Sequence, residues 1–109
     1  MLEGLKAALD ATNYNFANVA WTKAPAGDYG TYYCDGQEEL RTGASSVSEL
    51  MLHGFVDYFT RDNSSTPKAT IEAALDGLGI WWSLESIQFE SETGYIHYEW
   101  RWVDTNGKA

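Results

Sequence analysis

The residues of this chain with potential for chemistry are its two histidines, its one cysteine and its many carboxylates. His53 and His97, together with Asp57 or Glu99, could supply nitrogen and oxygen ligands to a zinc ion. The two histidines fall on different predicted strands, however, and zinc needs three or four ligands, for which Cys34 is the only thiolate. We therefore predict no metal site and no cofactor. We expect His97 on the wet face of its strand and His53 in or near the sheet.

Cys34 could also act as a nucleophile with a histidine as its base. It stands beside Asp35, whose negative charge disfavours a thiolate, and a lone cysteine is usually a small buried hydrophobe. The chain has no glycine-rich phosphate loop, paired-cysteine motif or G-x-S-x-G turn. Four glutamates near the last predicted hairpin could form a carboxylate pair, but such a run usually marks a solvated face: Glu85, Glu90, Glu92 and Glu99. We predict no catalytic residue and no enzymatic activity.

The segment that carries His97 has the clearest pattern in the chain. Over residues 95–103 every second residue is apolar, and mostly polar residues fill the alternate positions. The apolar set is Ile96, Tyr98, Trp100 and Trp102, and the polar set is His97, Glu99 and Arg101. A period of two predicts a β-strand with one buried face and one wet face. Because aromatic side chains bury the largest apolar area per residue, we expect this strand to anchor the core.

The other elements are weaker but complete an α+β order. Apolar spacing predicts a helix over 2–12 that Asn13 breaks, and a second one with Thr66 as its cap, Pro67 in its first turn and Gly79 at its end. Strands are predicted at 14–21, 29–34, 50–60 and 86–91, with the first two forming a hairpin. The order is α-β-β-β-α-β-β. We expect a two-layer sandwich in which an antiparallel sheet of four to five strands is packed by two helices.

Two features of the middle of the chain point to an interface. Residues 35–48 lose all periodicity, and a polar loop of that length in a small domain is usually functional or disordered. The strand predicted at 50–60 is largely apolar on both faces, although the helices can cover only one face of the sheet. The second apolar face is therefore either covered by a partner or packed by the long loop, and we leave both alternatives open.

Length and composition limit the remaining possibilities. The 109 residues suit a single domain over 1–109, with a flexible polar tail at 104–109. Sixteen acidic against seven basic residues give a net charge of −9, which argues against nucleic-acid recognition and suits a basic protein partner. One cysteine allows no internal disulfide, and neither a signal peptide nor a membrane span is apparent. We expect synthesis in the cytoplasm of the producing cell.

The order of segments resembles the small tail terminator (tail-completion, head–tail joining) proteins of phages and prophages. The resemblance runs through nearly the whole chain and rests on individually weak motifs that occur in a characteristic order. They are Leu5-Lys6-Ala7-Ala8-Leu9, Ala24-Pro25-Ala26-Gly27-Asp28, Tyr29-Gly30-Thr31-Tyr32-Tyr33, Val56-Asp57-Tyr58-Phe59-Thr60, Ile71-Glu72-Ala73-Ala74-Leu75, Gly79-Ile80-Trp81-Trp82, Ile87-Gln88-Phe89-Glu90 and Gly94-Tyr95-Ile96-His97-Tyr98-Glu99-Trp100. The strand at 50–60 and the loop before it depart most from the family pattern.

This resemblance implies a structural virion protein of the tail or neck, made in the host bacterial cytoplasm. It implies a ring, commonly of six subunits, that caps the head-proximal end of the tail tube and joins it to the head connector. The partners would be other copies of the chain, the tube protein and the connector protein. DNA would pass through the ring, repelled by its acidic surface, and no membrane would be involved. We expect the contacts at Gln37, Glu38, Glu39, Arg41, Met51, His53, Phe55 and Phe59.

Two alternatives remain. A small acidic immunity or antitoxin-type protein would neutralise a basic partner by charge complementarity. That class predicts a concentrated acidic patch, whereas the acids here are spread over every segment. A small enzyme is the third possibility, and it lacks convergent polar groups in the sequence.

Overall fold

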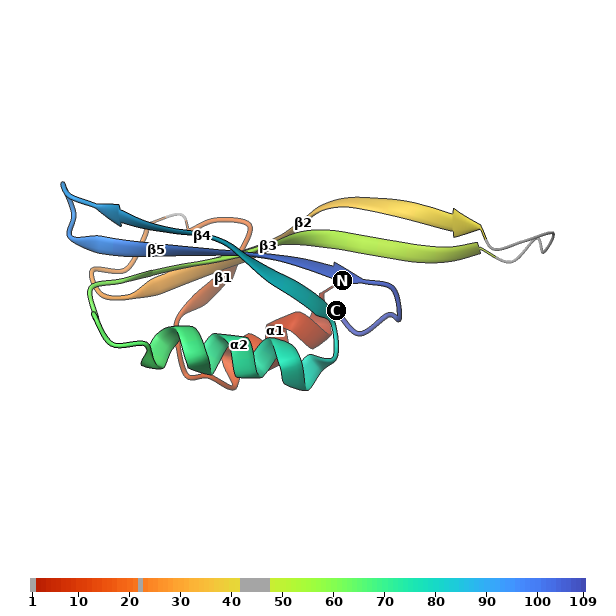
Figure 1. Ribbon diagram of the computed structural model, residues 1–109, viewed down its shortest axis with the longest axis horizontal. Coiled ribbons are helices and arrows are strands. Elements are labelled where there is room, and N and C mark those ends of the chain that lie inside the picture. The colour runs from red at the N-terminus through yellow and green to blue at the C-terminus, as the bar shows by residue number, and fades with distance from the viewer. Residues whose placement is uncertain (1, 22, 42–47) are drawn as a thin grey trace.

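The computed structural model describes residues 2–21, 23–41 and 48–109, and the side chains of 39–41, 48 and 49 lie outside this description. Its elements are α1 (Glu3–Asp10), β1 (Phe16–Asn18), β2 (Tyr29–Arg41), β3 (Ser48–Thr60), α2 (Thr66–Leu78), β4 (Trp81–Glu90) and β5 (Tyr95–Asp104). The five strands form one sheet in the order β1-β2-β3-β5-β4. Both helices lie together against one face of this sheet (Figure 1). The predicted α+β class and element order are confirmed.

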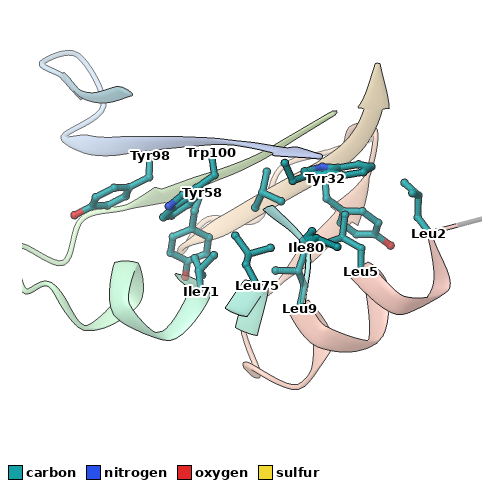
Figure 2. Packing of buried hydrophobic residues seen from close by; sticks show 12 residues of the cluster. Leu2, Leu5, Leu9, Tyr32, Tyr58, Ile71, Leu75, Ile80, Tyr98 and Trp100 are labelled. Atoms are coloured by element: carbon teal, nitrogen blue, oxygen red, sulfur yellow. The ribbon is translucent and has the colours of Figure 1, made fainter. Parts of the chain in front are cut away.

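The core lies between the two helices and the facing side of the sheet. Leu5 and Leu9 of α1 and Ile71 and Leu75 of α2 are fully buried, at the helical spacing that predicted them. Figure 2 shows these side chains pointing toward aromatic residues of the sheet. The aromatic members of the core are Tyr32, Tyr58, Tyr98, Trp100 and Trp102. The last strand is therefore an anchor of the core, as its alternation predicted.

The first two strands do not form the expected hairpin. β1 pairs with β2 in parallel, with Phe16 opposite Gly30 and Asn18 opposite Tyr32, so the sheet is mixed rather than antiparallel. A hairpin needs a short turn, but residues 19–28 separate these strands and allow the chain to cross back before it re-enters the sheet. The indole of Trp21 donates a hydrogen bond to the Gly30 carbonyl at 2.9 Å and so attaches this connection to the sheet.

The loop predicted at 35–48 is mostly strand. β2 continues to Arg41 and β3 begins at Ser48, with pairing unbroken from Gly36–His53 to Arg41–Ser48 after a bulge at Asp35. The sequence prediction failed because apolar alternation reflects burial of one strand face, and neither α1 nor α2 covers this part of the sheet. Only residues 42–47 of the predicted loop lie outside the described part of the chain.

The second helix begins one residue earlier than predicted and ends as predicted. Ser65, rather than Thr66, is its N-cap residue, and Pro67 lies in the first turn, where a missing N–H is tolerated. Gly79 ends the helix with φ of 79°, a left-handed conformation that glycine adopts without a steric penalty. β4 follows at once, five residues earlier than the strand predicted at 86–91.

Candidate functional site

The face of the sheet opposite the helices is the candidate functional surface, and we call it the open face. It is built from alternate residues of β2, β3 and β5, which the antiparallel register places in rows across the sheet. Four of the predicted contact residues are alternate residues of β3 and share this face: Met51, His53, Phe55 and Phe59. The structure therefore brings together the β3 part of the predicted set. It confirms that β3 carries apolar side chains on both faces.

An aromatic row crosses one end of the open face. Phe59 lies between Tyr29 of β2 and His97 of β5, its register partners on either side. The rings of Tyr29 and Phe59 are nearly parallel, with their centroids 4.8 Å apart, and the centroids of the Phe59 and His97 rings are 4.2 Å apart. Tyr95 packs edge-on against Phe59 and has the guanidinium of Arg61 over its ring at 4.0 Å. These contacts hold the His97 imidazole in a fixed orientation.

The next row places two carboxylates side by side. Asp57 of β3 and Glu99 of β5 are direct register partners, and Asp57 is only 7% exposed. His97 Nε2 donates a hydrogen bond to Asp57 Oδ1 at 2.8 Å. This hydrogen bond raises the pKa of His97 above its ordinary value, against the opposing effect of burial. Burial, followed by the charge of Asp57, raises the pKa of Glu99.

A second histidine cluster lies farther along the same face. His53 Nδ1 donates to Asp35 Oδ1 at 2.6 Å, and its Nε2 lies 3.8 Å from Glu38 Oε1. The guanidinium of Arg101 approaches His53 Nδ1 at 3.2 Å, but that nitrogen has no free lone pair while it donates to Asp35. Gly36 makes room for the ring, since a Cβ there would lie 2.5 Å from the imidazole. His53 is therefore a partly buried residue of the open face in a small polar network.

The structure separates Cys34 from both histidines, either of which a nucleophilic cysteine would need as its base. Cys34 packs against the core cluster on the helix side of the sheet, and its thiol donates to the Gly36 carbonyl at 3.2 Å. Both histidines lie on the open face, so the sheet stands between either imidazole and this thiol. The carboxylate pair that does form, Asp57 with Glu99, joins two strands and differs from the set of four glutamates considered from the sequence.

The paired strands β2 and β3 run past the rest of the molecule as an arm, which we define as residues 37–41 and 48–52. Its pairs extend from Gln37–Leu52 to Arg41–Ser48, whereas the pairing of β5 with β3 ends at Leu52. The arm leaves the helices behind and gives the molecule a long dimension of 54 Å against 27 and 23 Å (Figure 1). The predicted contacts Gln37, Glu38, Glu39 and Arg41 are strand residues of this arm, although the side chains of Glu39 and Arg41 lie outside the described set.

Sequence reasoning missed a further surface at the edge strand β4. Three large apolar side chains are exposed there: Trp81 (57%), Ile87 (55%) and Phe89 (70%). β4 pairs only with β5, so its outer backbone groups have no strand partner within the described sheet. No proline interrupts it, and lysine, a common protector of sheet edges, is missing from Trp81–Glu90. The signal in the sequence was the alternation of Ile87 and Phe89, which as alternate residues of one strand share an apolar face.

No protein-family model matches this chain, and a search of curated proteins finds no match either. Among the residues that the structure describes, no helix has the length and apolar character needed to cross a membrane.

Proposed function

We propose that this protein is a structural virion component of the tail terminator type. In this role it would form a closed ring, with six subunits as the family expectation, at the head-proximal end of a phage tail tube and would join the tube to the head connector. The resemblance in segment order suggests the family. The observation that carries the proposal is the arm, against which no other described element of the same subunit packs as a second layer.

An unsupported arm is better suited to a subunit contact than to an isolated domain. A two-stranded ribbon is only marginally stable in water without a third strand or a packing layer. Its described apolar side chains include Leu50, which is 53% exposed, and the partly exposed Met51. A neighbouring copy would supply the missing layer and bury these side chains.

The position of the two exposed surfaces favours a head-to-tail contact. The arm lies at one end of the long axis, and the turn between β4 and β5 lies at the other (Figure 1). We propose that the arm of one copy packs on the β4 edge of the next, where Ile87 and Phe89 are exposed. Contacts between two different surfaces close into rings when the rotation between copies allows it.

The charge of the chain fits passage of DNA rather than its capture. A net charge of −9 opposes binding to phosphates, because nucleic-acid affinity depends chiefly on lysine and arginine contacts. A ring built from such subunits would present an acidic surface to DNA and would release it freely.

Co-expression with the tube-forming protein encoded beside this gene is the direct test. We expect electron microscopy to show tubes of limited length, each with a ring at one end only. A variant that lacks most of the arm, with residues 38–51 replaced by an Asn-Gly turn, should leave the tubes uncapped. The turn joins Gln37 to Leu52, which are register partners of β2 and β3. A substitution on the exposed surface of α1, Lys6→Gln, is the control and should cap normally. Tubes of unchanged length with the wild-type protein, or a neighbouring gene for a basic nuclease that the protein binds, would contradict the proposal.

A further inference from the structure

We propose that Asp57, His97 and Glu99 form a binding site for a divalent transition-metal ion, with Zn²⁺ as the best fit. Each residue offers one ligand atom, and the three atoms lie within 4.8 Å of one another. The proposal is independent of any role in a phage tail. It departs from the sequence prediction, which paired the two histidines and overlooked that the register joins Asp57 to Glu99.

The strands hold the three side chains in place. Asp57 and Glu99 are opposite residues of an antiparallel pair, and His97 precedes Glu99 by two positions and so shares its face. The Phe59 ring stacks on the imidazole with 4.2 Å between centroids. Ligands on paired strands need little reordering to bind an ion, and this lowers the entropic penalty of binding.

The cluster of Asp57, His97 and Glu99 carries more negative than positive charge, which favours binding of a cation. Asp57 is 7% exposed, and Glu99 is partly buried beside it. Within the described residues, no lysine or arginine forms an ion pair with either carboxylate, and the nearby Arg101 faces Asp35 instead. A dication would neutralise both carboxylates, as a single imidazolium cannot. Crowding of like charges in a half-buried place is unfavourable without such compensation.

The ligand set selects the class of metal. One imidazole nitrogen and two carboxylate oxygens suit Zn²⁺ or Mn²⁺, whereas Ca²⁺ and Mg²⁺ prefer oxygen ligands alone. Bonds of about 2.0–2.2 Å to Zn²⁺ place neighbouring ligands roughly 3.3 Å apart. The 2.8 Å between His97 Nε2 and Asp57 Oδ1 therefore has to open by about half an ångström. Three protein ligands leave a coordination position for water.

Calorimetric titration of the EDTA-treated protein with ZnCl₂ at pH 7.5 tests the proposal, with Mn²⁺ and Mg²⁺ as comparison ions. We expect one ion per chain, micromolar or tighter affinity for Zn²⁺, and no detectable Mg²⁺ binding. His97→Gln, Asp57→Asn and Glu99→Gln should each weaken Zn²⁺ binding by at least about tenfold. His53→Gln is the matched control, because His53 lies on the same face with carboxylates nearby, and it should bind normally.

The absorption spectrum of bound Co²⁺ gives a second readout of the same site. Four-coordinate Co²⁺ should absorb in the visible range with the wild-type protein and with His53→Gln, but not with His97→Gln. Circular dichroism checks that each variant is folded. Absence of Zn²⁺ binding at millimolar concentration, or equal loss of binding in His53→Gln and His97→Gln, would overturn the proposal.

Discussion

His97 Nε2 donates a 2.8 Å hydrogen bond to Oδ1 of Asp57 across the two central antiparallel strands. The aspartate is almost fully buried, and the imidazole stacks on Phe59. This pair therefore links β3 and β5 by charge as well as by backbone hydrogen bonds. Its protonation state affects the stability of the sheet.

Stability should fall as the pH rises through the titration of His97. Its hydrogen bond to Asp57 raises the pKa of the imidazole, so the folded state holds the proton more tightly than the unfolded state. The stabilisation is complete below about pH 6.5, the unfolded value, and is lost as the pH rises through the higher folded value. Glu99 also lowers stability as the pH rises, but at a lower pH than His97, since the pKa of its carboxyl group is raised in the folded state as well. The facing charges are Asp57, Glu99 and Glu90.

Urea unfolding in EDTA at a series of pH values measures this dependence. We expect the free energy of unfolding to decline less steeply above pH 6.5 in His97→Gln and in Asp57→Asn, because either change removes one partner of the hydrogen bond. The double variant should show no weaker pH dependence than either single variant. Lys6→Gln should retain the wild-type slope. An unchanged slope in His97→Gln would show that other groups cause the pH dependence.

Two glycines in different surroundings should respond oppositely to alanine. A Cβ at Gly54 would overlap the carbonyl of Tyr33 and lie 2.8 Å from Cζ2 of Trp102, so Gly54→Ala should destabilise the protein by about 1–3 kcal/mol. Gly77 lies in α2 with nothing within 4 Å of the added Cβ. Gly77→Ala should therefore stabilise by about 0.5–1 kcal/mol through helix propensity. Chemical denaturation of the two variants checks the signs, and destabilisation in both would contradict this account.

The outcomes of sequence prediction follow burial along the chain. The α2 segment and β5 were predicted well because each buries one regular face, with Leu75 and Trp100 completely covered. Most of the arm was predicted as loop because none of the described helices covers it, and so burial imposes no alternation on its sequence. The direction of β1 depends on where the 19–28 connection travels, which local periodicity cannot encode.

The residues of the candidate sites also divide into those that the sequence could group and those that only the tertiary fold brings together. Met51, His53, Phe55 and Phe59 could be grouped from the sequence because alternate residues of one strand share a face. The pairing of Asp57 with Glu99 and His97 needs the register between β3 and β5, which are separated in sequence by α2 and β4. The exposed β4 edge needs the strand order. Neither relationship exists before the tertiary fold is known.

Asp104 should be a major determinant of how the C-terminal segment is held. Its carboxylate, in a residue only 2% exposed, accepts hydrogen bonds from the backbone N–H groups of Asn106, Lys108 and Ala109 at 3.1, 3.1 and 2.8 Å. The backbone oxygen of Ala109 in turn accepts from the Leu5 N–H at 2.9 Å, in the first turn of α1. The segment at 104–109 is thus joined to the first helix.

Removal of that carboxylate should loosen both segments. We expect Asp104→Ala to destabilise the protein by about 2–4 kcal/mol, because three N–H groups lose a charged acceptor, and Asp104→Asn to destabilise it by less. Hydrogen exchange at the Leu5 amide should accelerate in Asp104→Ala. Asp62→Ala is the control, since that carboxylate accepts a single bond from Ser64 N–H in an exposed turn and should matter by less than about 1 kcal/mol. Unchanged exchange at Leu5 would show that the α1 contact does not depend on Asp104.

Mixing two defective variants should reveal the direction of subunit contact. The arm-shortened protein, in which Asn-Gly joins Gln37 to Leu52, retains β4, whereas Ile87→Lys/Phe89→Lys retains the arm and blocks the edge. In a head-to-tail assembly each variant alone should remain monomeric. A mixture should form a one-to-one dimer and stop, because only one competent arm and one competent edge can meet.

Native mass spectrometry of the separate and mixed proteins distinguishes the possible geometries. A dimer formed by the edge-blocked variant alone would indicate arm-to-arm contact and contradict the head-to-tail arrangement. If the arm-shortened variant alone formed an oligomer of the same size as the wild-type protein, the arm would be dispensable for assembly. Lys6→Gln should assemble like the wild type, since its side chain pairs with Asp10 on the exposed surface of α1. The one-to-one limit is the decisive result, because a contact between identical surfaces would not need one copy of each variant.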